Sequence, residues 1–410
     1  MQVRQLALLL LLLAASPRCL AETPAQGEAP QQQPATATMV PIGYLKQEVK
    51  KVIPLSRLKV EPEDIGIAGA EIALTDNNTT GRFTKQQFTL EVERVPVGGD
   101  AVEALEKLVQ RGHHYIVVDA PAETLLRLSD AVKGKDVLLF NVRASDENLR
   151  EKDCRANVLH TAPDRAMLAD ALAQYLVWKR WQRWLVVKGV FPEDLAYLDM
   201  VRRSAKRFGA TIVEEREYKE TPGARRSDSG EQQIQQQMPV FTQGAPSYDV
   251  VVVADERDVF GSYLPYRTWD PRPVAGSAGL MPTSWDAAQD QWGAIQMQNR
   301  FFKLNSRRMT ARDMQAWTAA RMIGEAASRT NSGDPKPVFD FLKSADFSIA
   351  AFKGQRLTLR DWNLQLRQPI LLVDGRMVVS VSPQEGFLHQ YSELDTLGID
   401  RPETKCKLSG

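Results

Sequence analysis

The stretch YIVVDAPAETLLRLSDAVKGKDVLLFNVRAS, residues 115–145, decides the fold class. Residues 115–119 are a short apolar run that predicts a buried strand. Residues 122–132 carry leucines at helical spacing, and Gly134 follows where a helix is expected to end. Residues 137–140 predict a second buried strand. Strand, helix and strand in about 30 residues form a βαβ unit, whose two strands are parallel.

Turn and polar residues follow both of these strands. In open α/β sheets, ligands bind outside the carboxyl ends of the strands. The candidate binding residues at these two ends are Asp119, Ala120, Ala122, Arg143, Ala144 and Ser145. Arg143 has two interpretations of equal standing. Its guanidinium binds an anion by a two-pronged hydrogen bond, or it forms a salt bridge to Asp119 on the neighbouring strand end.

Length and charge narrow the class of protein. The 410 residues are enough for two domains with sizeable cores. The chain has 52 Lys and Arg against 51 Asp and Glu, so we expect no nucleic-acid partner. Its four histidines form no metal-ligand pattern, and the sequence has no G-x-S-x-G, phosphate-loop or dinucleotide motif. We therefore expect a protein that is not an enzyme and holds no metal or cofactor.

The N-terminus has the pattern of a secretory signal peptide, residues 1–21. Arg4 precedes an apolar core that is too short to span a bilayer, and small residues precede a cut after Ala21. An uncleaved anchor and lipidation of Cys19 are the alternatives. Residues 22–38 are rich in Pro, Ala and Gln and predict a disordered leader.

Removal of the signal peptide takes away Cys19, so the exported chain keeps two cysteines, Cys154 and Cys406, in an oxidising compartment. We expect them to form a disulfide that ties the C-terminal tail to the region after the βαβ unit. The alternative is two unrelated thiols.

After Cys154 the alternation of strands and helices restarts, which predicts a second α/β layer set up to about residue 282. Helices are expected over residues 285–305 and 310–329, the second with Thr310 as its N-cap. Later strands at residues 370–373 and 377–382 are joined by a hairpin turn at Asp374-Gly375.

Two α/β lobes in one exported chain, with late helices and a final strand set, resemble type I periplasmic binding proteins, above all the branched-chain amino acid group. The segments that carry the resemblance are Gly69–Asn77, Tyr115–Asp119, Phe140–Leu149, Asn157–Pro163 and Tyr248–Ala254. Asp153–Pro163 and His389–Asp395 look like the subgroup associated with pyrroloquinoline-quinone-dependent alcohol oxidation.

The resemblance implies an α/β fold of two Rossmann-like lobes with parallel-sheet cores, joined by a hinge. The expected lobes are residues 39–157 with about 283–355, and residues 158–282 with about 356–390; residues 391–410 form a tail. It also implies that the second lobe contributes ligand contacts from His160, Thr161, Asp255 and Ser277. The hinge is expected near Asn157, near Pro282 and between the C-terminal helices and strands.

By the same resemblance, the protein is a monomer in the periplasm that binds a small molecule and serves an ABC permease in the inner membrane. Two turns depart from the family pattern. Lys46–Lys51 replaces a Gly/Ser-rich turn, and Asp119–Ala122 replaces a Ser/Thr-rich one. These departures disfavour a standard amino acid as the ligand. A sensor, or an accessory or chaperone protein of a quinoprotein oxidation system, is the alternative function, and an enzyme is a third.

Overall fold

The computed structural model describes residues 37–50, 60–219 and 228–408. The expected signal peptide, residues 1–21, and all but the last two residues of the expected leader lie outside these ranges. No helix within them is both long and apolar enough to cross a membrane.

The first sheet is parallel throughout, with the strand order β2-β1-β3-β4-β5. Its strands are β1 (Thr38–Gln47), β2 (Gln86–Val95), β3 (Tyr115–Asp119), β4 (Leu138–Asn141) and β5 (Val158–His160). β3 and β4 pair in parallel with α3 (Ala122–Ala131) between them in the chain, so the predicted βαβ unit is confirmed. The order reverses between β1 and β3, which makes their carboxyl ends the switch point of the sheet.

Alternate residues of the buried strand β3 serve two different cores. Tyr115 and Val117 pack with α1 (Ile67–Thr84), whereas Ile116 and Val118 pack with α2 (Ala101–Gln110) and α3. This alternation is the period of two that a strand covered on both faces requires.

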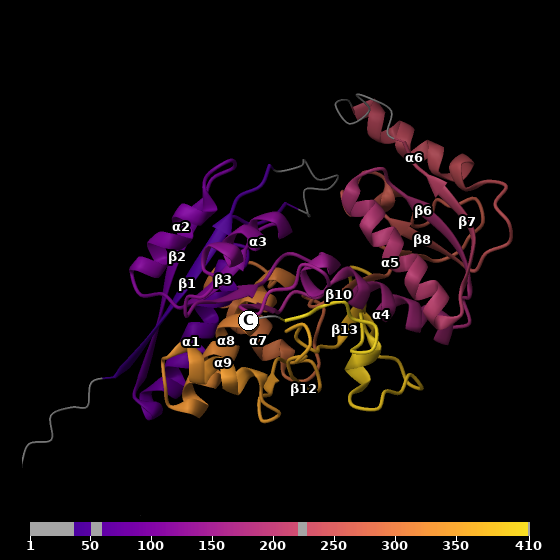
Figure 1. The fold of residues 1–410 in the computed structure, drawn as a ribbon. Coiled ribbons are helices and arrows are strands. Elements are labelled where there is room, and N and C mark those ends of the chain that lie inside the picture. Colours follow the sequence, from indigo (N-terminus) through magenta and orange to yellow (C-terminus); the bar gives the residue numbers. More distant parts are fainter. Residues whose placement is uncertain (1–36, 51–59, 220–227, 409–410) are drawn as a thin grey trace, which may run out of the picture. The chain divides into compact units, whose positions relative to one another are not determined.

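The late helices complete the first core. In Figure 1 the orange helices α7 (Ala294–Asn305), α8 (Ala311–Thr330) and α9 (Pro335–Lys343) lie beside the indigo α1. α1 and α8 approach so closely that a Cβ atom on Gly69 would lie 1.9 Å from the carbonyl oxygen of Asp313. The small residues near the start of α1 therefore allow the two helices to pack this closely.

The second sheet is also parallel, with the order β7-β6-β8-β9. Its strands are β6 (Arg183–Lys188), β7 (Thr211–Glu217), β8 (Val250–Ala254) and β9 (Val274–Gly276). The helices of this part are α4 (Arg165–Trp178), α5 (Pro192–Phe208) and α6 (Asp228–Thr242). Two parallel α/β layer sets, as predicted, are thus present in one chain.

A three-stranded antiparallel sheet joins β10 (Met281–Thr283), β13 (Ile370–Val373) and β14 (Val378–Ser382), and the predicted hairpin at Asp374-Gly375 is confirmed. A two-stranded sheet pairs β11 (Ile349–Ala350) with β12 (Arg356–Leu357). Short 3-10 turns occur at Glu147–Arg150, Gly261–Tyr263 and Glu393–Thr396.

Two expected boundaries differ from the observed ones. The helix expected from residue 285 begins only at Ala294, because Asp286 accepts a hydrogen bond from the backbone of Ala288 in a turn and Gly293 takes a left-handed conformation before the first helical turn. In addition, β5 belongs to the first sheet, beyond the boundary that we expected at residue 157.

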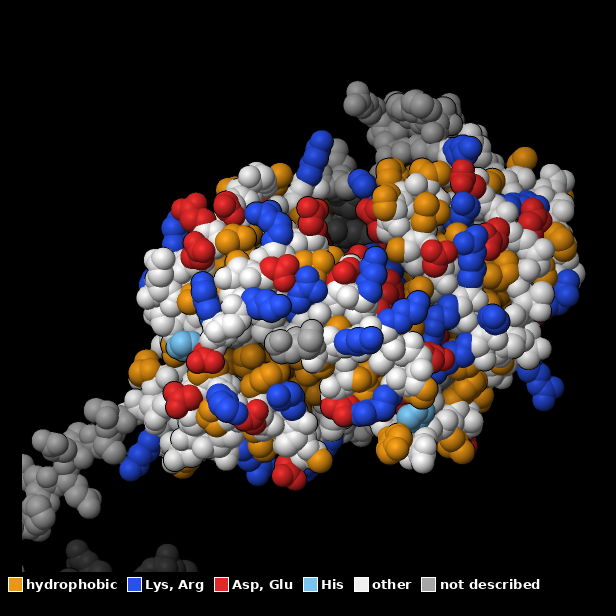
Figure 2. All heavy atoms as spheres, viewed as in Figure 1, with side chains coloured by type: hydrophobic (Ala, Val, Ile, Leu, Met, Phe, Trp, Pro, Cys, Tyr) orange, Lys and Arg blue, Asp and Glu red, His pale blue; other side chains and the backbone are white. Residues whose placement is uncertain are grey.

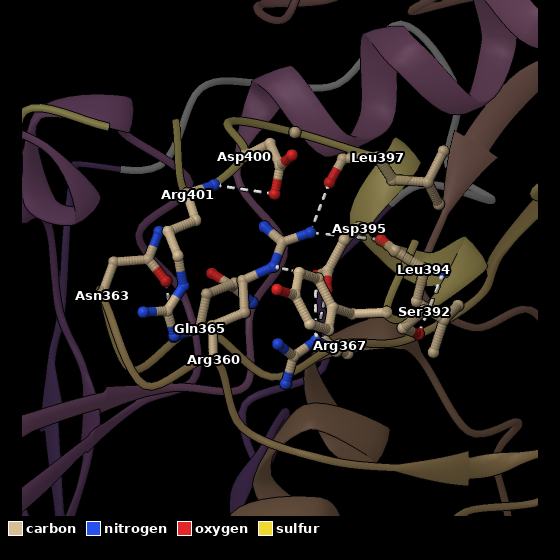
Figure 3. A network of polar contacts seen from close by, with 12 residues as sticks. Arg360, Asn363, Gln365, Arg367, Ser392, Leu394, Asp395, Leu397, Asp400 and Arg401 are labelled. Carbon is tan, nitrogen blue, oxygen red and sulfur yellow. Dashed lines mark hydrogen bonds and ion pairs between the residues drawn. The ribbon is translucent and has the colours of Figure 1, made fainter. Parts of the chain in front are cut away.

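The C-terminal tail is fixed at several points. Cys154 and Cys406 form the predicted disulfide. The side chain of Glu151 accepts hydrogen bonds from Thr404 and from the backbone of Lys405. Upstream, Asp395 lies in a buried network with Arg360 and Arg367, shown in Figure 3.

Candidate functional site

The switch point of the first sheet holds a buried charge cluster. Lys46 at the end of β1 stands opposite Asp119 at the end of β3 in the strand register. Asp119 is fully buried, and the hydroxyl of Tyr44 donates to its Oδ2 over 3.3 Å. Burial and the charge of Asp119 raise the pKa of Tyr44 well above its usual value, so Tyr44 is a neutral donor.

Two arginines share the other oxygen of Asp119. The Nη1 atoms of Arg143 and Arg312 each lie 3.5 Å from Oδ1. The salt bridge that we considered for Arg143 is therefore present. Arg312, in the first turn of α8, was not predicted, because no local pattern marks a residue so far along the chain as a neighbour of Asp119.

The charges of this cluster shift one another's pKa values. Burial, followed by the nearby charge of Arg312, lowers the pKa of Arg143. Burial also lowers the pKa of Arg312, but Asp119 and Glu61 outweigh it and raise this pKa overall. The pair therefore combines mutual repulsion with attraction to one shared carboxylate.

A cavity of about 510 Å³ lies in front of the two arginines, a size typical of small-molecule sites. It is lined by Val60, Glu61, Pro62, Ile65, Arg143, Ser145, Ala162, Pro163, Leu168, Pro282, Thr283, Ser284, Thr310, Ala311, Arg312 and Gln315. A smaller cavity of about 190 Å³ also has Arg143 and Arg312 in its wall. The segment before α1, the loops after β4 and β5, the end of β10 and the start of α8 thus meet here.

Of the expected residues in the first lobe, Arg143 and Ser145 line the larger cavity. Asp119 lies behind the arginines. Ala120 and Ala144 are buried, and the carbonyl of Ala144 accepts hydrogen bonds from the side chains of Asn141 and Arg150. Ala122 is the first residue of α3 and lines neither cavity.

His160 and Thr161 have their contacts inside the protein. Nδ1 of His160 lies 3.0 Å from the side-chain nitrogen Nδ2 of Asn141. Burial, followed by the charge of Arg150, lowers the pKa of His160 well below its usual value. The hydroxyl of Thr161 donates to the carbonyl of Gln315. Neither residue lines the larger cavity, although Ala162 and Pro163, which follow directly, do.

Asp255 and Ser277 stabilise a loop after β8. The carboxylate of Asp255 accepts hydrogen bonds from the backbone of Val259, Phe260 and Gly261. The hydroxyl of Ser277 accepts from the backbone of Asp255. The structure therefore does not bring these two residues together with Arg143 and Ser145.

A polar link that we did not predict joins the loop after β4 to the loop after β8. Arg165, in the first turn of α4, donates to Glu256 through Nε (2.9 Å) and Nη2 (2.8 Å), and its Nη1 lies 3.3 Å from Asp146. Burial opposes the charge of Arg165, but its bonds to Glu256 outweigh this and raise the pKa of Arg165.

Figure 2 shows basic and acidic side chains interspersed over the visible face, in keeping with the balanced composition. Within the described ranges no cluster of His, Cys, Asp and Glu suited to a metal ion is present.

Comparisons with known proteins agree with this architecture. Residues 67–237 match the model of a family described as periplasmic binding protein. A periplasmic binding protein from Burkholderia mallei is similar over 92% of this chain and 100% of its own, with 15% identity and a TM-score of 0.63. A branched chain amino acid ABC transporter periplasmic ligand-binding protein from Burkholderia xenovorans covers 83% of this chain and 95% of its own, with 17% identity and a TM-score of 0.66.

The chain has the fold of periplasmic ligand-binding proteins. A third solved structure, a solute binding protein of an ABC transporter from R. palustris in complex with benzoate, covers 90% of this chain and 99% of its own, at 11% identity and a TM-score of 0.61. The search of curated proteins gave no match. The expected fold class, two parallel-sheet α/β layer sets of the periplasmic binding protein type, is confirmed.

Proposed function

We propose that this protein is the periplasmic solute-binding component of an ABC transporter and holds a small polar solute in the cavity beyond the carboxyl ends of β4 and β5 in the first sheet. The observation that carries the proposal is the cavity of about 510 Å³ built from Arg143, Ser145 and the start of α8. It stands at the carboxyl ends of parallel strands, where α/β sheets bind their ligands. The solved neighbours are solute-binding proteins, which supports the same assignment.

The proposed mechanism is conformational rather than chemical. Ala162–Pro163 and Pro282–Ser284 line the cavity, and both segments lie where the chain passes between the parallel sheets. Movement in these segments therefore changes the walls of the binding site. A solute that contacts both sides stabilises the closed form, which the permease recognises. The ion pair between Arg165 and Asp146 is a contact that such a movement would make or break, while Arg165 stays bound to Glu256 within the second layer set.

In the proposed closed form, further residues complete the site: Asp255 and Ser277 from the second layer set, and His160 and Thr161 from the end of β5 in the first sheet. Asp255, Ser277, His160 and Thr161 remain candidates from the family resemblance, and their backbone and side-chain bonds fix the loops that carry them. The proposed link to pyrroloquinoline-quinone-dependent alcohol oxidation rests on the sequence resemblance, and the expectation that no cofactor is bound rests on the missing sequence motifs.

Native mass spectrometry of the protein exported to the periplasm tests this proposal, followed by a thermal-shift screen of amino acids, short acids, alcohol-oxidation products and quinone cofactors. We expect a bound small molecule, or a rise in melting temperature from one chemical class. Ser145→Phe, which fills the cavity, should abolish that rise. Thr80→Phe, on the exposed side of α1, is the matched control and should keep it.

An empty protein that no compound stabilises would contradict the proposal and favour the sensor or accessory role. Equal binding by the Ser145→Phe and Thr80→Phe variants would show that the solute binds elsewhere.

A further inference from the structure

We infer that the solute carries a carboxylate group, and that Arg143 and Arg312 together bind it. This inference rests on the proposed function and names the chemical class of its ligand. It follows from the charges, the unused hydrogen-bond donors and the shape of the cavity wall.

Positive charge is in excess among the buried side chains of the switch point. Lys46, Arg143 and Arg312 are 5%, 18% and 19% exposed, and the buried carboxylate whose charge acts on all three is Asp119, at 0%. The buried Asp313 nearby is paired with Arg307. The nearby Glu48, Glu61 and Arg94 are more exposed, at 33%, 56% and 45%, so water screens their charges. Buried charges are normally paired, so this described cluster lacks an anion.

The two arginines make few hydrogen bonds to the described residues through their guanidinium donors. Both guanidinium groups lie 3.5 Å from Oδ1 of Asp119, which accepts no hydrogen bond within the described chain. Arg143 donates once from its side chain, to the carbonyl of Gln47 over 3.3 Å. Arg312 makes ion pairs with Asp119 and Glu61, but no hydrogen bond to any described residue from its guanidinium.

Lys46 does not compete for the same ligand. Its ammonium group donates to the carbonyl of Glu63 over 2.7 Å and does not line the larger cavity. Of the described cations, those that line the larger cavity and have donors not bonded to any described residue are therefore the two arginines. A planar guanidinium offers a pair of parallel donors that matches the two oxygens of a carboxylate.

The position of the pair favours a ligand that bridges two parts of the chain. Arg143 follows β4, whereas Arg312 lies in the first turn of α8, and both line both cavities. An anion at this point would offset their mutual repulsion while Asp119 continues to hold them side by side.

The remaining wall fits the body of a small organic acid. Ile65, Leu168 and the neighbouring prolines provide apolar surface, and Ser145 and Thr310 provide hydroxyl groups. A mixed wall of this kind suits a solute with one charged end and a short apolar or hydroxylated body, rather than a free inorganic anion.

Matched acids and amides test the inference on the wild-type protein, without reliance on any variant. The probes are benzoate and benzamide, leucine and leucinamide, and lactate and lactamide, with inorganic phosphate added. Thermal shift identifies the responding pair, and isothermal titration measures its dissociation constants. We expect the acid of at least one pair to bind, and its amide and phosphate to bind roughly 100-fold more weakly or not at all.

Two variants then assign the binding groups. Arg143→Gln and Arg312→Gln should each weaken binding of the responding acid by roughly 10- to 100-fold, the range expected for a lost charged hydrogen bond. Arg300→Gln is the control, because Arg300 is half-exposed, pairs with Asp76 on α1 and lines neither of the two cavities. Melting curves without ligand establish that each variant is folded.

The inference is overturned if an amide binds as tightly as its acid, or if both cavity variants keep wild-type affinity for the acid. A neutral or cationic solute found by native mass spectrometry would also overturn it, while the proposed function would stand. If the exported protein is empty and no probe binds, both the inference and the proposed function fail.

Discussion

Replacing Asp395 by Asn should destabilise the protein strongly. Asp395 is 1% exposed, and its Oδ1 accepts from Nε of Arg360 and Nε of Arg367, each over 2.9 Å. Arg360 is fully buried and donates its remaining bonds to the carbonyls of Leu394 and Leu397 (Figure 3). An amide in place of the carboxylate would leave the buried charge of Arg360 without its ion-pair partner, with only the more distant charge of Asp164 to offset it.

The loss from breaking a buried ion pair on one side is about 3–5 kcal/mol. Arg367 adds little to this figure, because it is 14% exposed and its charge is partly screened by solvent. A loss of this size is a large part of the ~5–15 kcal/mol that stabilises an ordinary protein. We therefore expect Asp395→Asn to lower the urea midpoint markedly.

Asp361→Asn is the matched control for this change. Asp361 also pairs with an arginine of the same region, Arg401, but both side chains are more than half exposed. Surface pairs of this kind contribute ~0–1 kcal/mol, so this variant should unfold close to wild type. Urea unfolding followed by tryptophan fluorescence compares the two variants, and the ring of Trp362 lies 5.3 Å from the guanidinium carbon of Arg360. Equal midpoints for the two variants would refute the reasoning that burial decides the cost.

Three further changes test other parts of the structure. Cys154→Ser should cost ~2–5 kcal/mol of stability and leave solute binding intact; equal melting of the wild-type protein with and without reductant would contradict this. Gly69→Ala should lower the free energy of unfolding by ~1–3 kcal/mol, because its Cβ would collide with the backbone of Asp313, whereas Glu71→Ala on the exposed side of the same helix should have little effect. Burial lowers the pKa of Lys353 from 10.5 to about 7, so the unfolded chain holds the extra proton between these values, and stability should rise with pH across this window. At pH 7 the free energy of unfolding of Lys353→Met should therefore exceed that of wild type by ~2–5 kcal/mol, and this difference should vanish near pH 10.5. If the free energies of unfolding of the two proteins changed in parallel with pH, the buried charge would not be the cause.

The local features of the fold could be predicted because they depend on neighbouring residues. Thr310 forms a reciprocal cap with Asp313, as its position before an apolar helical stripe predicts. The turn at Asp374-Gly375 follows from residue types alone. By contrast, the pairing order of the strands follows from the family resemblance and not from any one segment.

The binding site could be predicted only in part, because a side chain's type does not show what it will contact. Asp255 was a reasonable candidate after a buried strand, yet its carboxylate accepts hydrogen bonds from three backbone groups that follow within six residues. This structural role could have been predicted, since Asp side chains at the start of a loop favour hydrogen bonds to backbone groups just downstream. Arg165 and Glu256 gave no such signal, because each is an ordinary charged residue until the fold joins them.

The two interpretations of Arg143 are not exclusive once the structure supplies Arg312. A single arginine beside Asp119 would be neutralised, and the salt bridge would account for it fully. With a second arginine on the same oxygen, one carboxylate is shared between two cations at 3.5 Å from each, and one positive charge is left over. The salt bridge then orients the two guanidinium groups but does not neutralise both of their charges. An arginine that is structural by its contact with Asp119 can therefore still bind an anion from the cavity side.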